Sequence, residues 1–440
     1  MASSSPGIEQ TQRRTLSAAE VRAQCSALGF DLVGITDVRT SEHEAFYRAW
    51  LEAGRHGEMG YLSRADAVER RVRPHAAHPE LRSAIVLGIN YSSDQADTDD
   101  SARHADSLRA EDPSRGIIAR YARGRDYHKV IRKKLIVLLR WLEEYAGTSL
   151  SHAHACVDTS PVLERELAQR AGLGWFGRSS MLINPKHGSY FFLATLLVEL
   201  DFVELDAPFE RDHCGTCSAC VDVCPTGALL GRDENGAPVI DATRCISYQT
   251  IENRGPIPHE LRPLIGNRIF GCDICQEVCP WNGAKFVSIT RERDFEPRMP
   301  AKEPTGEGVG KRVTPRVPGT DAPSLIELMG MDEAEWDEFS HGSAIRRAKR
   351  AGFLRNVAVA LGNWGSDEAV PVLVEALSDS EPLVRGHAAW ALGRIASAEA
   401  RAALAAHAGR ETDGHVREEL LAAIAQRQPE TRSAARPSPA

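Results

Sequence analysis

The stretch CGTCSACVDVCP, residues 214–225, carries four cysteines in a C-x2-C-x2-C-x3-C run that ends in proline: Cys214, Cys217, Cys220 and Cys224. Bacterial ferredoxins with two 4Fe-4S clusters have this spacing. A second, incomplete copy, CDICQEVCP at residues 272–280, adds Cys272, Cys275 and Cys279, and Cys245 lies upstream of it. Eight thiolates match the ligand count of two cubane clusters, so the sequence predicts a ferredoxin-like module over residues 206–290.

The ligands can be assigned from the way such ferredoxins bind their clusters. Three closely spaced cysteines hold one cluster, while the cysteine before proline crosses to the other. The first cluster is therefore predicted to be bound by Cys214, Cys217, Cys220 and Cys279. The second is predicted to be bound by Cys224, Cys245, Cys272 and Cys275. Two structural zinc sites would need as many thiolates, but zinc ribbons lack this cysteine run.

Composition limits the class of protein. The chain has 440 residues, of which 42% are hydrophobic and 26% charged, as expected for a soluble protein with about three folded units. A net charge of -8 argues against a uniformly basic nucleic-acid binder and leaves room for a local basic patch. Arg13 and Arg14 precede no apolar stretch, and thiolate ligands need a reducing compartment. We expect a cytoplasmic, monomeric protein that does not contact a membrane.

The N-terminal part alternates helical and strand patterns, which predicts an α/β domain over residues 15–205. A helix is expected to begin at Ser17, with a Ser-x-x-Glu capping box, and to end at Gly29. Short buried strands are expected at DLVGIT, SAIVLGINY and SYFFLATLLVEL. The polar residues 92–114 predict a mobile surface loop.

Two further helices are expected in this domain. Apolar residues recur every three or four positions from His128 to Tyr145, which is typical of a helix packed on a core. Ser160 and Pro161 have the residue types of an N-cap and a first helical position. This helix start would place Asp158 just outside a helix N-terminus.

The C-terminal part contains a repeat. Residues 291–340 are rich in proline and glycine and predict a linker or long loop. Beyond it, LRNVAVALG, VRGHAAWALG and VREELLAAIA place three apolar residues equivalently: Leu361, Leu392 and Ile424. Repeated helix pairs of this kind predict a HEAT-like α-solenoid over residues 341–428, with an ordinary helical bundle as the alternative. The tails, 1–14 and 429–440, are expected to be disordered.

The cysteines alone do not define the reaction. Iron-sulfur clusters move one electron at a time, so two of them indicate a path for electrons to another centre. No G-x-G-x-x-G follows a strand and no P-loop is present, so the sequence does not support a bound dinucleotide or ATP. We therefore expect the catalytic site in the N-terminal domain.

Long motifs in the same order resemble the epoxyqueuosine reductase family over most of residues 15–290: RYARGRDYHK, VDTSPVLERELAQRAGLGWFGRSSMLIN, RCISYQTIENRGPIP and GNRIFGCDICQEVCPWN. The resemblance implies a cobalamin-dependent enzyme that reduces the epoxide of epoxyqueuosine at the wobble base of tRNA with a GUN-type anticodon. The family is similar to reductive dehalogenases in pairing a corrinoid with two 4Fe-4S clusters. The chain has no D-x-H-x-x-G signature, so cobalamin is implied by the resemblance alone.

The implied fold is α+β, with an N-terminal α/β cobalamin-type domain, a ferredoxin-like two-cluster module and a C-terminal HEAT-like solenoid. The resemblance makes Asp158 the proton donor, because an opened epoxide leaves an oxygen that a carboxylic acid of raised pKa can protonate. The alternative is a turn aspartate that bonds nearby amides. The corrin is expected to be bordered by Met59, Tyr61, Arg71, Tyr127, His128, Arg178, Ser179, Ser180, Leu182 and Asp273, with Gly34 as a further candidate. Many relatives have Lys-Asn where this chain has Arg178 and Ser179.

Two segments are candidates for RNA contact. RYARGRDYHK, residues 120–129, mixes aromatic side chains with Arg120, Arg123, Arg125 and Lys129, and its alternative is a helix start capped by Asp126. The first solenoid helix, AIRRAKRAGFLR, is basic, which predicts tRNA contacts by Arg346, Arg347, Lys349 and Arg350. Three functions stay open: a tRNA-modifying epoxide reductase, a corrinoid reductase of a small molecule, and a non-catalytic electron carrier. The electron donor is unidentified.

Overall fold

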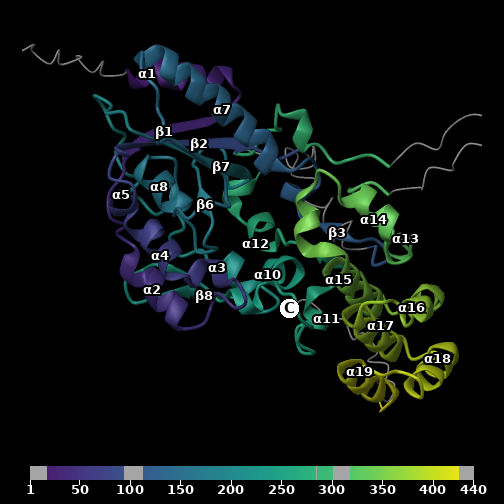
Figure 1. Ribbon diagram of the computed structural model, residues 1–440. Coiled ribbons are helices and arrows are strands. Elements are labelled where there is room, and N and C mark those ends of the chain that lie inside the picture. Colours follow the sequence, from purple (N-terminus) through teal and green to yellow (C-terminus); the bar gives the residue numbers. More distant parts are fainter. Residues whose placement is uncertain (1–16, 94–111, 284, 301–317, 426–440) are drawn as a thin grey trace, which may run out of the picture.

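The computed structural model describes residues 17–93, 112–283, 285–300 and 318–425. The predicted tails, 1–14 and 429–440, lie outside these residues, as does most of the predicted loop at 92–114. A body built around a sheet is joined to a stack of helices on the C-terminal side (Figure 1). Among the residues described, no helix is long and apolar enough to cross a membrane.

One sheet of four antiparallel strands organises the N-terminal part. Its order is β1 (Leu32–Asp37), β2 (Ser83–Asn90), β7 (Phe191–Val198) and β4 (His154–Cys156). Every residue of β2 is buried, because this strand has a neighbour on each side and helices on both faces. The three strands predicted from apolar runs are therefore confirmed as β1, β2 and β7.

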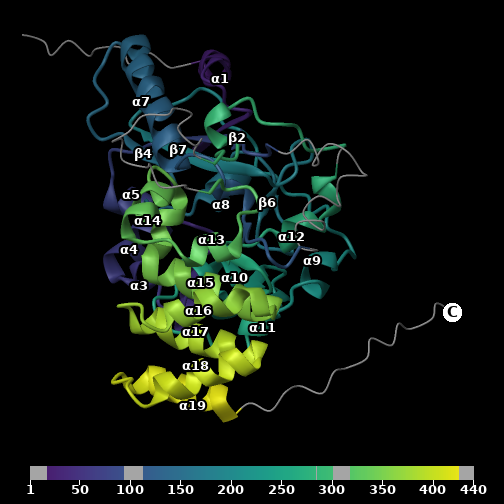
Figure 2. The same ribbon diagram turned by 90° about the vertical axis from the view of Figure 1, so that its right-hand side faces the viewer.

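Helices cover both faces of this sheet (Figures 1 and 2). On one face α1 (Ala18–Ala27) and the long amphipathic helix α7 (Tyr127–Ala146) bury a common apolar cluster with the strands. On the other face α8 (Glu164–Arg170) packs Leu167 and Ala168 against the sheet. A Cβ on Gly34 of β1 would collide with the carbonyl oxygen of Ala171. Gly34 thus permits close strand-helix packing, and its place beside the corrin stays a prediction.

Two predicted helix starts differ from the structure. Ser17 is the N-cap of α1, but its side chain makes no capping hydrogen bond, so the expected capping box does not form. The helix expected at Pro161 begins at Glu164, because residues before it form turns, including a Val162 N–H bond to the Ser160 carbonyl. Asp158 therefore lies in a turn well before α8.

Four short helices follow β1: α2 (Glu44–Glu52), α3 (Gly60–Ser63), α4 (Ala65–Val72) and α5 (Pro74–Ala77). One pair of short strands, β3 (Ile117–Ile118) with β10 (Arg268–Phe270), ties the cysteine-rich segment to the body. Two further pairs are local: β5 (Trp175–Phe176) with β6 (Leu182–Ile183) in the N-terminal part, and β8 (Leu229–Arg232) with β9 (Pro238–Ile240) in the cysteine-rich segment. The helical turns in and around it are η3 (Arg120–Ala122), α9 (Ala219–Asp222), η4 (Ala242–Arg244), α10 (Ile246–Ile251), α11 (Arg262–Ile265), α12 (Ile274–Glu277), η5 (Pro280–Asn282) and η6 (Arg293–Phe295).

The C-terminal stack is helical throughout (Figure 2). It contains η7 (Ala344–Ala348), α15 (Lys349–Trp364), η8 (Asp367–Ala369), α16 (Val370–Ala376), α17 (Pro382–Ile395), α18 (Ala398–Ala408) and α19 (Gly414–Ala425). α17 packs between α15 and α19, as expected for a solenoid. Leu361 and Leu392 are fully buried, whereas Ile424 is 42% exposed because it lies on the last helix of the stack.

The predicted linker over 291–340 is wrong in its last part. Two helices, α13 (Leu325–Met329) and α14 (Glu333–Ser340), occupy this stretch, and α14 begins with a capping box between Asp332 and Glu335. Their buried apolar residues join one hydrophobic core with the stack and with residues 246–270 of the cysteine-rich segment. The solenoid and the two-cluster module therefore share a core.

Candidate active site and cluster-binding cysteines

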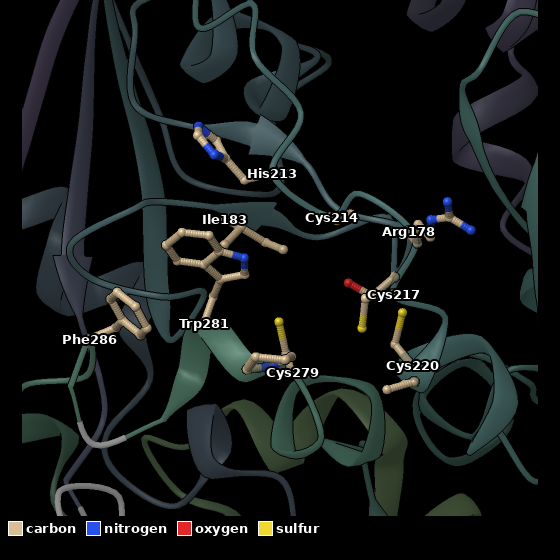
Figure 3. Close-up of a pocket in the computed structure, with 12 residues that line it drawn as sticks. Arg178, Ile183, His213, Cys214, Cys217, Cys220, Cys279, Trp281 and Phe286 are labelled. Atoms are coloured by element: carbon tan, nitrogen blue, oxygen red, sulfur yellow. The ribbon is translucent and has the colours of Figure 1, made fainter.

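The first predicted set of thiols surrounds a cavity of about 280 Å³. Its lining includes Cys214, Cys217, Cys220 and Cys279, together with Arg178, Ser179, His213, Trp281 and Phe286. Figure 3 shows the sulfur atoms of Cys217, Cys220 and Cys279 pointing toward one space. Burial raises the pKa of Cys279 to about 11, and the charges of the other three thiols add to this effect. These thiols would need a cationic group between them to ionise together.

The second predicted set lies deeper. Burial raises the pKa of Cys272 to about 12, with the charge of Cys245 contributing. Burial also raises the pKa of Cys245, and Cys224 acts on it in the same direction. Cys275 interacts with Cys272 and Cys245 of its own set and with Cys220 of the first. The structure brings the eight cysteines together in the predicted fours, and the ligation itself stays a prediction.

The chain fold explains this convergence. The two cysteine runs form matching short helices, α9 and α12, which contact one another. Cys245 is the N-cap of α10 and enters the second set from a different segment. In the part of the chain that the structure describes, no group of three or more His, Cys, Asp or Glu residues is arranged to hold a single metal ion.

Asp158 has an unusual backbone conformation. Its φ is +56°, in the left-handed region that residues other than glycine rarely adopt. Its Oδ2 accepts a hydrogen bond from the Tyr127 hydroxyl at 3.0 Å and lies 3.4 Å from His128 Nε2. Its backbone N–H donates to Glu164 Oε1 at 2.9 Å. The Asp158 side chain is 65% exposed, so its carboxylate is held in place and accessible to a reactant.

The protonation states differ from the expectation of a raised Asp158 pKa. Partial desolvation by the surrounding protein works to raise the pKa of Asp158, but hydrogen bonds from His128 and Tyr127 outweigh this effect and hold the pKa below its ordinary value. Burial works to lower the pKa of His128, but hydrogen bonds to Asp126 and Asp158 raise it to about 9. At neutral pH the proton therefore resides on His128, and Asp158 is a carboxylate.

Arg165 interacts with both the Asp158 turn and the second set of thiols. Its guanidinium donates to the Ser180 carbonyl at 2.7 Å. Burial lowers the pKa of Arg165, while its interactions with Asp158, Glu164 and Cys275 act in the opposite direction. The second set thus lies on the side of Asp158. Cys217 of the first set is exposed.

The predicted corrin residues do not all lie in one place. Near Asp158 are Tyr127, His128 and Tyr61, and the Arg71 guanidinium donates to the Tyr61 carbonyl at 3.4 Å. Met59 is the N-cap of α3, which carries Tyr61. Ser180 also has a positive φ, 62°, and its buried hydroxyl has no hydrogen-bond partner among the residues described.

Other predicted corrin residues lie elsewhere. Arg178 and Ser179 line the cavity of the first thiols, and Arg178 donates to the Gly215 carbonyl. Leu182 is buried in the apolar cluster beneath α8, which argues against a corrin contact. Asp273 is 5% exposed and accepts the Arg120 N–H at 2.7 Å, so it fixes the η3 turn.

The basic segment predicted for tRNA binding is divided. Residues 344–348 form the 3-10 turn η7, and Lys349, with a φ of +60°, separates it from α15. The predicted continuous helix is therefore wrong at its start. Arg346 pairs with Asp337 and Arg350 with Asp379, which reduces the charge they can offer to phosphate.

Arg347 differs from its neighbours because it contacts Glu252 and the Tyr61 ring. It makes two hydrogen bonds to Glu252, at 2.9 and 2.8 Å, and its charge acts on Tyr61. The charge of Asp158 in turn raises the pKa of Arg347, after the larger effect of Glu252. Sequence reasoning did not identify Glu164, Arg165 or Glu252 as site residues. The only sequence signal for the first two was their position in the motif that contains Asp158.

Comparisons with known proteins agree with this arrangement. The family described as epoxyqueuosine reductase QueG matches residues 71–159, a 4Fe-4S double cluster binding domain matches 213–282, and HEAT repeats match 343–425. The epoxyqueuosine reductase of Escherichia coli (strain K12) is 41% identical over 83% of this chain and 86% of its own length. That of Pseudomonas aeruginosa is 43% identical over 83% of this chain and 91% of its own length.

Solved structures give the same picture. A crystal structure of epoxyqueuosine reductase with an epoxyqueuosine-modified tRNA-Tyr stem loop has a TM-score of 0.75 and 29% identity, over 92% of this chain and 97% of that chain. The Bacillus subtilis enzyme has a TM-score of 0.73 and 29% identity over the same shares of both chains. In that structure the loop of a catalytic aspartate is swung out of the active site. The predicted HEAT repeats and two-cluster module are confirmed by the family matches.

Proposed function

The chain belongs to the epoxyqueuosine reductase family, and we propose that His128 and Asp158 deliver the protons with which it reduces epoxyqueuosine in tRNA to queuosine. The observation that carries this proposal is the contact between the two side chains. A carboxylate that is 65% exposed lies 3.4 Å from an imidazole that holds a proton at neutral pH. Such a pair can protonate an oxygen that develops negative charge.

The balance of the reaction requires this supply of protons. Conversion of an epoxide to an alkene consumes two electrons and two protons, and the oxygen leaves as water. Asp158, as the more exposed member of the pair, transfers a proton from His128 to the epoxide oxygen. Tyr127 holds the Asp158 carboxylate in position through its hydroxyl. The pair regains a proton from solvent before the second transfer.

Electrons reach this site through two 4Fe-4S clusters of the double-cluster domain. In our proposal an external donor reduces the first cluster, because its set contains the exposed Cys217. The second set of thiols would hold its cluster on the side of Asp158, since Arg165 interacts with both Cys275 and Asp158. A monomeric, cytoplasmic enzyme is part of the proposal.

We further infer that cobalamin binds between the second thiol set and Asp158. Three features of the described residues fit such a ligand: the buried Ser180 hydroxyl without a partner, the exposed ring of Tyr61, and the accessible Asp158 carboxylate. Ser180 and Tyr61 would contact the corrin, with Arg71 supporting Tyr61 from behind. Bound cobalamin supplies a metal centre that accepts single electrons from clusters and passes them to a carbon centre.

The tRNA is proposed to bind where the solenoid meets the catalytic turn. Arg347 is the basic residue of the predicted set whose charge reaches both Tyr61 and Asp158. It is 52% exposed while paired with Glu252, so one edge of its guanidinium is open to a phosphate or a base. A tRNA with a GUN-type anticodon would then have its wobble base at Tyr61.

Reduction of a stem loop distinguishes this function from a small-molecule corrinoid reductase. The enzyme, loaded with iron, sulfide and cobalamin and reduced chemically, is given equal concentrations of an epoxyqueuosine-containing stem loop and of the free nucleoside. Mass analysis of the products should show queuosine from the stem loop at a much higher kcat/KM. Equal turnover of both substrates would favour a small-molecule enzyme, and turnover of neither would favour an electron carrier.

A further inference from the structure

Asp158 is hydrogen-bonded to two different helices, to one through its side chain and to the other through its backbone N–H. Its carboxylate accepts the Tyr127 hydroxyl at the start of α7, and its backbone N–H donates to Glu164, the first residue of α8. The turn between them has few other bonds: the Thr159 N–H bonds the Val157 carbonyl, and the Val162 N–H bonds the Ser160 carbonyl. Both of these bonds are local, so they do not fix the turn relative to the helices.

The left-handed backbone at Asp158 makes this attachment important. A residue with a Cβ avoids this conformation unless its surroundings impose it. A hydrogen bond from the strained residue's own N–H to a side chain of a packed helix imposes it directly. Without the bond the turn would relax, and the carboxylate would leave its place beside Tyr127 and His128.

We propose that Glu164 is a positioning residue that holds the Asp158 turn in its reactive conformation. This inference deepens the proposed function and rests on it. Glu164 requires only an acceptor oxygen for the role, since the bond is to a backbone N–H. In the structure of the B. subtilis relative, the loop of a catalytic aspartate is swung out of the active site.

The charged groups around Glu164 agree with an uncharged acceptor. They are Asp158, Arg165 and His128. Burial raises the pKa of Glu164 to about 8, and the charge of Asp158 adds to the effect. At neutral pH the side chain is therefore a neutral acid, which avoids two adjacent carboxylates while still accepting the Asp158 N–H. A glutamine amide has the same shape and the same acceptor oxygen.

The test compares three variants at Glu164. Glu164→Gln keeps the acceptor oxygen and cannot ionise, whereas Glu164→Ala removes the oxygen. Glu164→Asp keeps an acceptor oxygen on a side chain that is one methylene shorter. A matched control is Glu199→Ala, because Glu199 also accepts a backbone N–H, that of His152 at 2.8 Å, far from the catalytic turn. Hydrogen exchange of residues 157–163, iron content and thermal unfolding are measured on each variant, along with kcat and KM for the stem loop.

The Ala variant should lose about 10²-fold in kcat at unchanged KM, because the reactive group is misplaced while tRNA contacts remain. Amide exchange of residues 157–163 should accelerate in Ala and not in Gln. The Gln variant should retain most of the wild-type rate, and Asp should fall between Gln and Ala. If Glu164→Ala does not fold, the Gln and Asp variants give the same comparison.

Two results would overturn the proposal. A Gln variant as slow as Ala, with normal exchange of the turn, would make Glu164 a proton donor. Wild-type kcat and exchange in Ala or Asp would remove any role in positioning. A wild-type enzyme that did not convert the stem loop would count against the proposed function, whereas the exchange measurement on the turn would still stand.

Discussion

The guanidinium of Arg347 lies 5.6 Å from the centroid of the Tyr61 ring. Arg347 belongs to the segment that opens the solenoid, and Tyr61 to a short helix of the N-terminal part. A charged group stacked on an exposed ring at this distance is a cation-π contact, and nucleic-acid-binding surfaces use the same combination. The contact brings the repeat region to the border of the catalytic site.

The change Arg347→Gln should therefore weaken tRNA binding more than the same change at the neighbouring basic residues. Loss of one phosphate contact should lower the slope of log affinity against log salt by about one, and KM should rise. Arg346→Gln should have a smaller effect, because Arg346 already pairs with Asp337. Fluorescence anisotropy with a labelled stem loop across a salt titration measures the affinity and the salt slope of both variants.

Replacing all four basic residues, Arg346, Arg347, Lys349 and Arg350, by Glu should abolish most of the salt dependence of tRNA binding while leaving iron content unchanged. Affinity and salt slope equal to those of the wild type would remove this segment from tRNA binding.

Asp158→Asn should reduce kcat by about 10²- to 10⁴-fold, the usual contribution of a general acid. The amide can still hydrogen-bond Tyr127, so folding, iron content and tRNA affinity should not change. Single-turnover assays with prereduced enzyme measure the loss. A near wild-type rate would mean that the proton comes from another group.

The rate should fall as pH rises through about 9. The pKa of His128 is raised to this value by its bonds to Asp126 and Asp158, so the proton that the pair donates is present below pH 9 and lost above it. Single-turnover rates from pH 6 to 10 should show this decline. His128→Gln should abolish it, whereas His152→Gln, on the exposed surface, should keep it. A profile unchanged by His128→Gln would exclude the pair as the proton source.

Cys245→Ala should leave about half of the iron, because one cluster loses a ligand and the other keeps all four. Cys25→Ala, a change at a buried cysteine outside both sets, should leave the iron content complete. Iron analysis and visible absorption measure this. Stoichiometric zinc without charge-transfer absorption in the wild-type protein would end the iron-sulfur assignment.

The parts of this molecule that sequence predicts well are those that depend on local spacing. The cysteine runs, the buried strands and α7 follow from periodicity and residue type, since each is a property of neighbouring positions. The start of α8 was predicted wrongly, because the bond from Asp158 to Glu164 and the turns before it replace the helical bonds that Ser160 and Pro161 would favour. At this position the tertiary hydrogen bond between Asp158 and Glu164 outweighs the local preference of Ser160 and Pro161 for a helix start.

The protonation of the site could not be predicted from sequence. An aspartate beside a helix gave no indication that His128 would approach its carboxylate and hold the proton instead. Likewise, the sequence of the basic segment did not indicate which acidic residue each arginine would pair with. Arg346 and Arg347 are adjacent in the chain, yet one meets Asp337 and the other Glu252. Tertiary packing alone decides these partners.

The core that the solenoid shares with the cysteine-rich segment limits how the chain can be divided. At its centre Arg262 of α11 makes two hydrogen bonds to Glu419 of α19, and both side chains are almost completely buried. A chain cut before residue 325 would expose this core and remove Glu419, the ion-pair partner of Arg262. Truncation should therefore yield aggregates, and the intact protein should melt in one transition across both regions. The helical repeats complete the hydrophobic core of the cysteine-rich segment. A destabilising mutation in the last helix can therefore lower the cellular abundance of the whole enzyme.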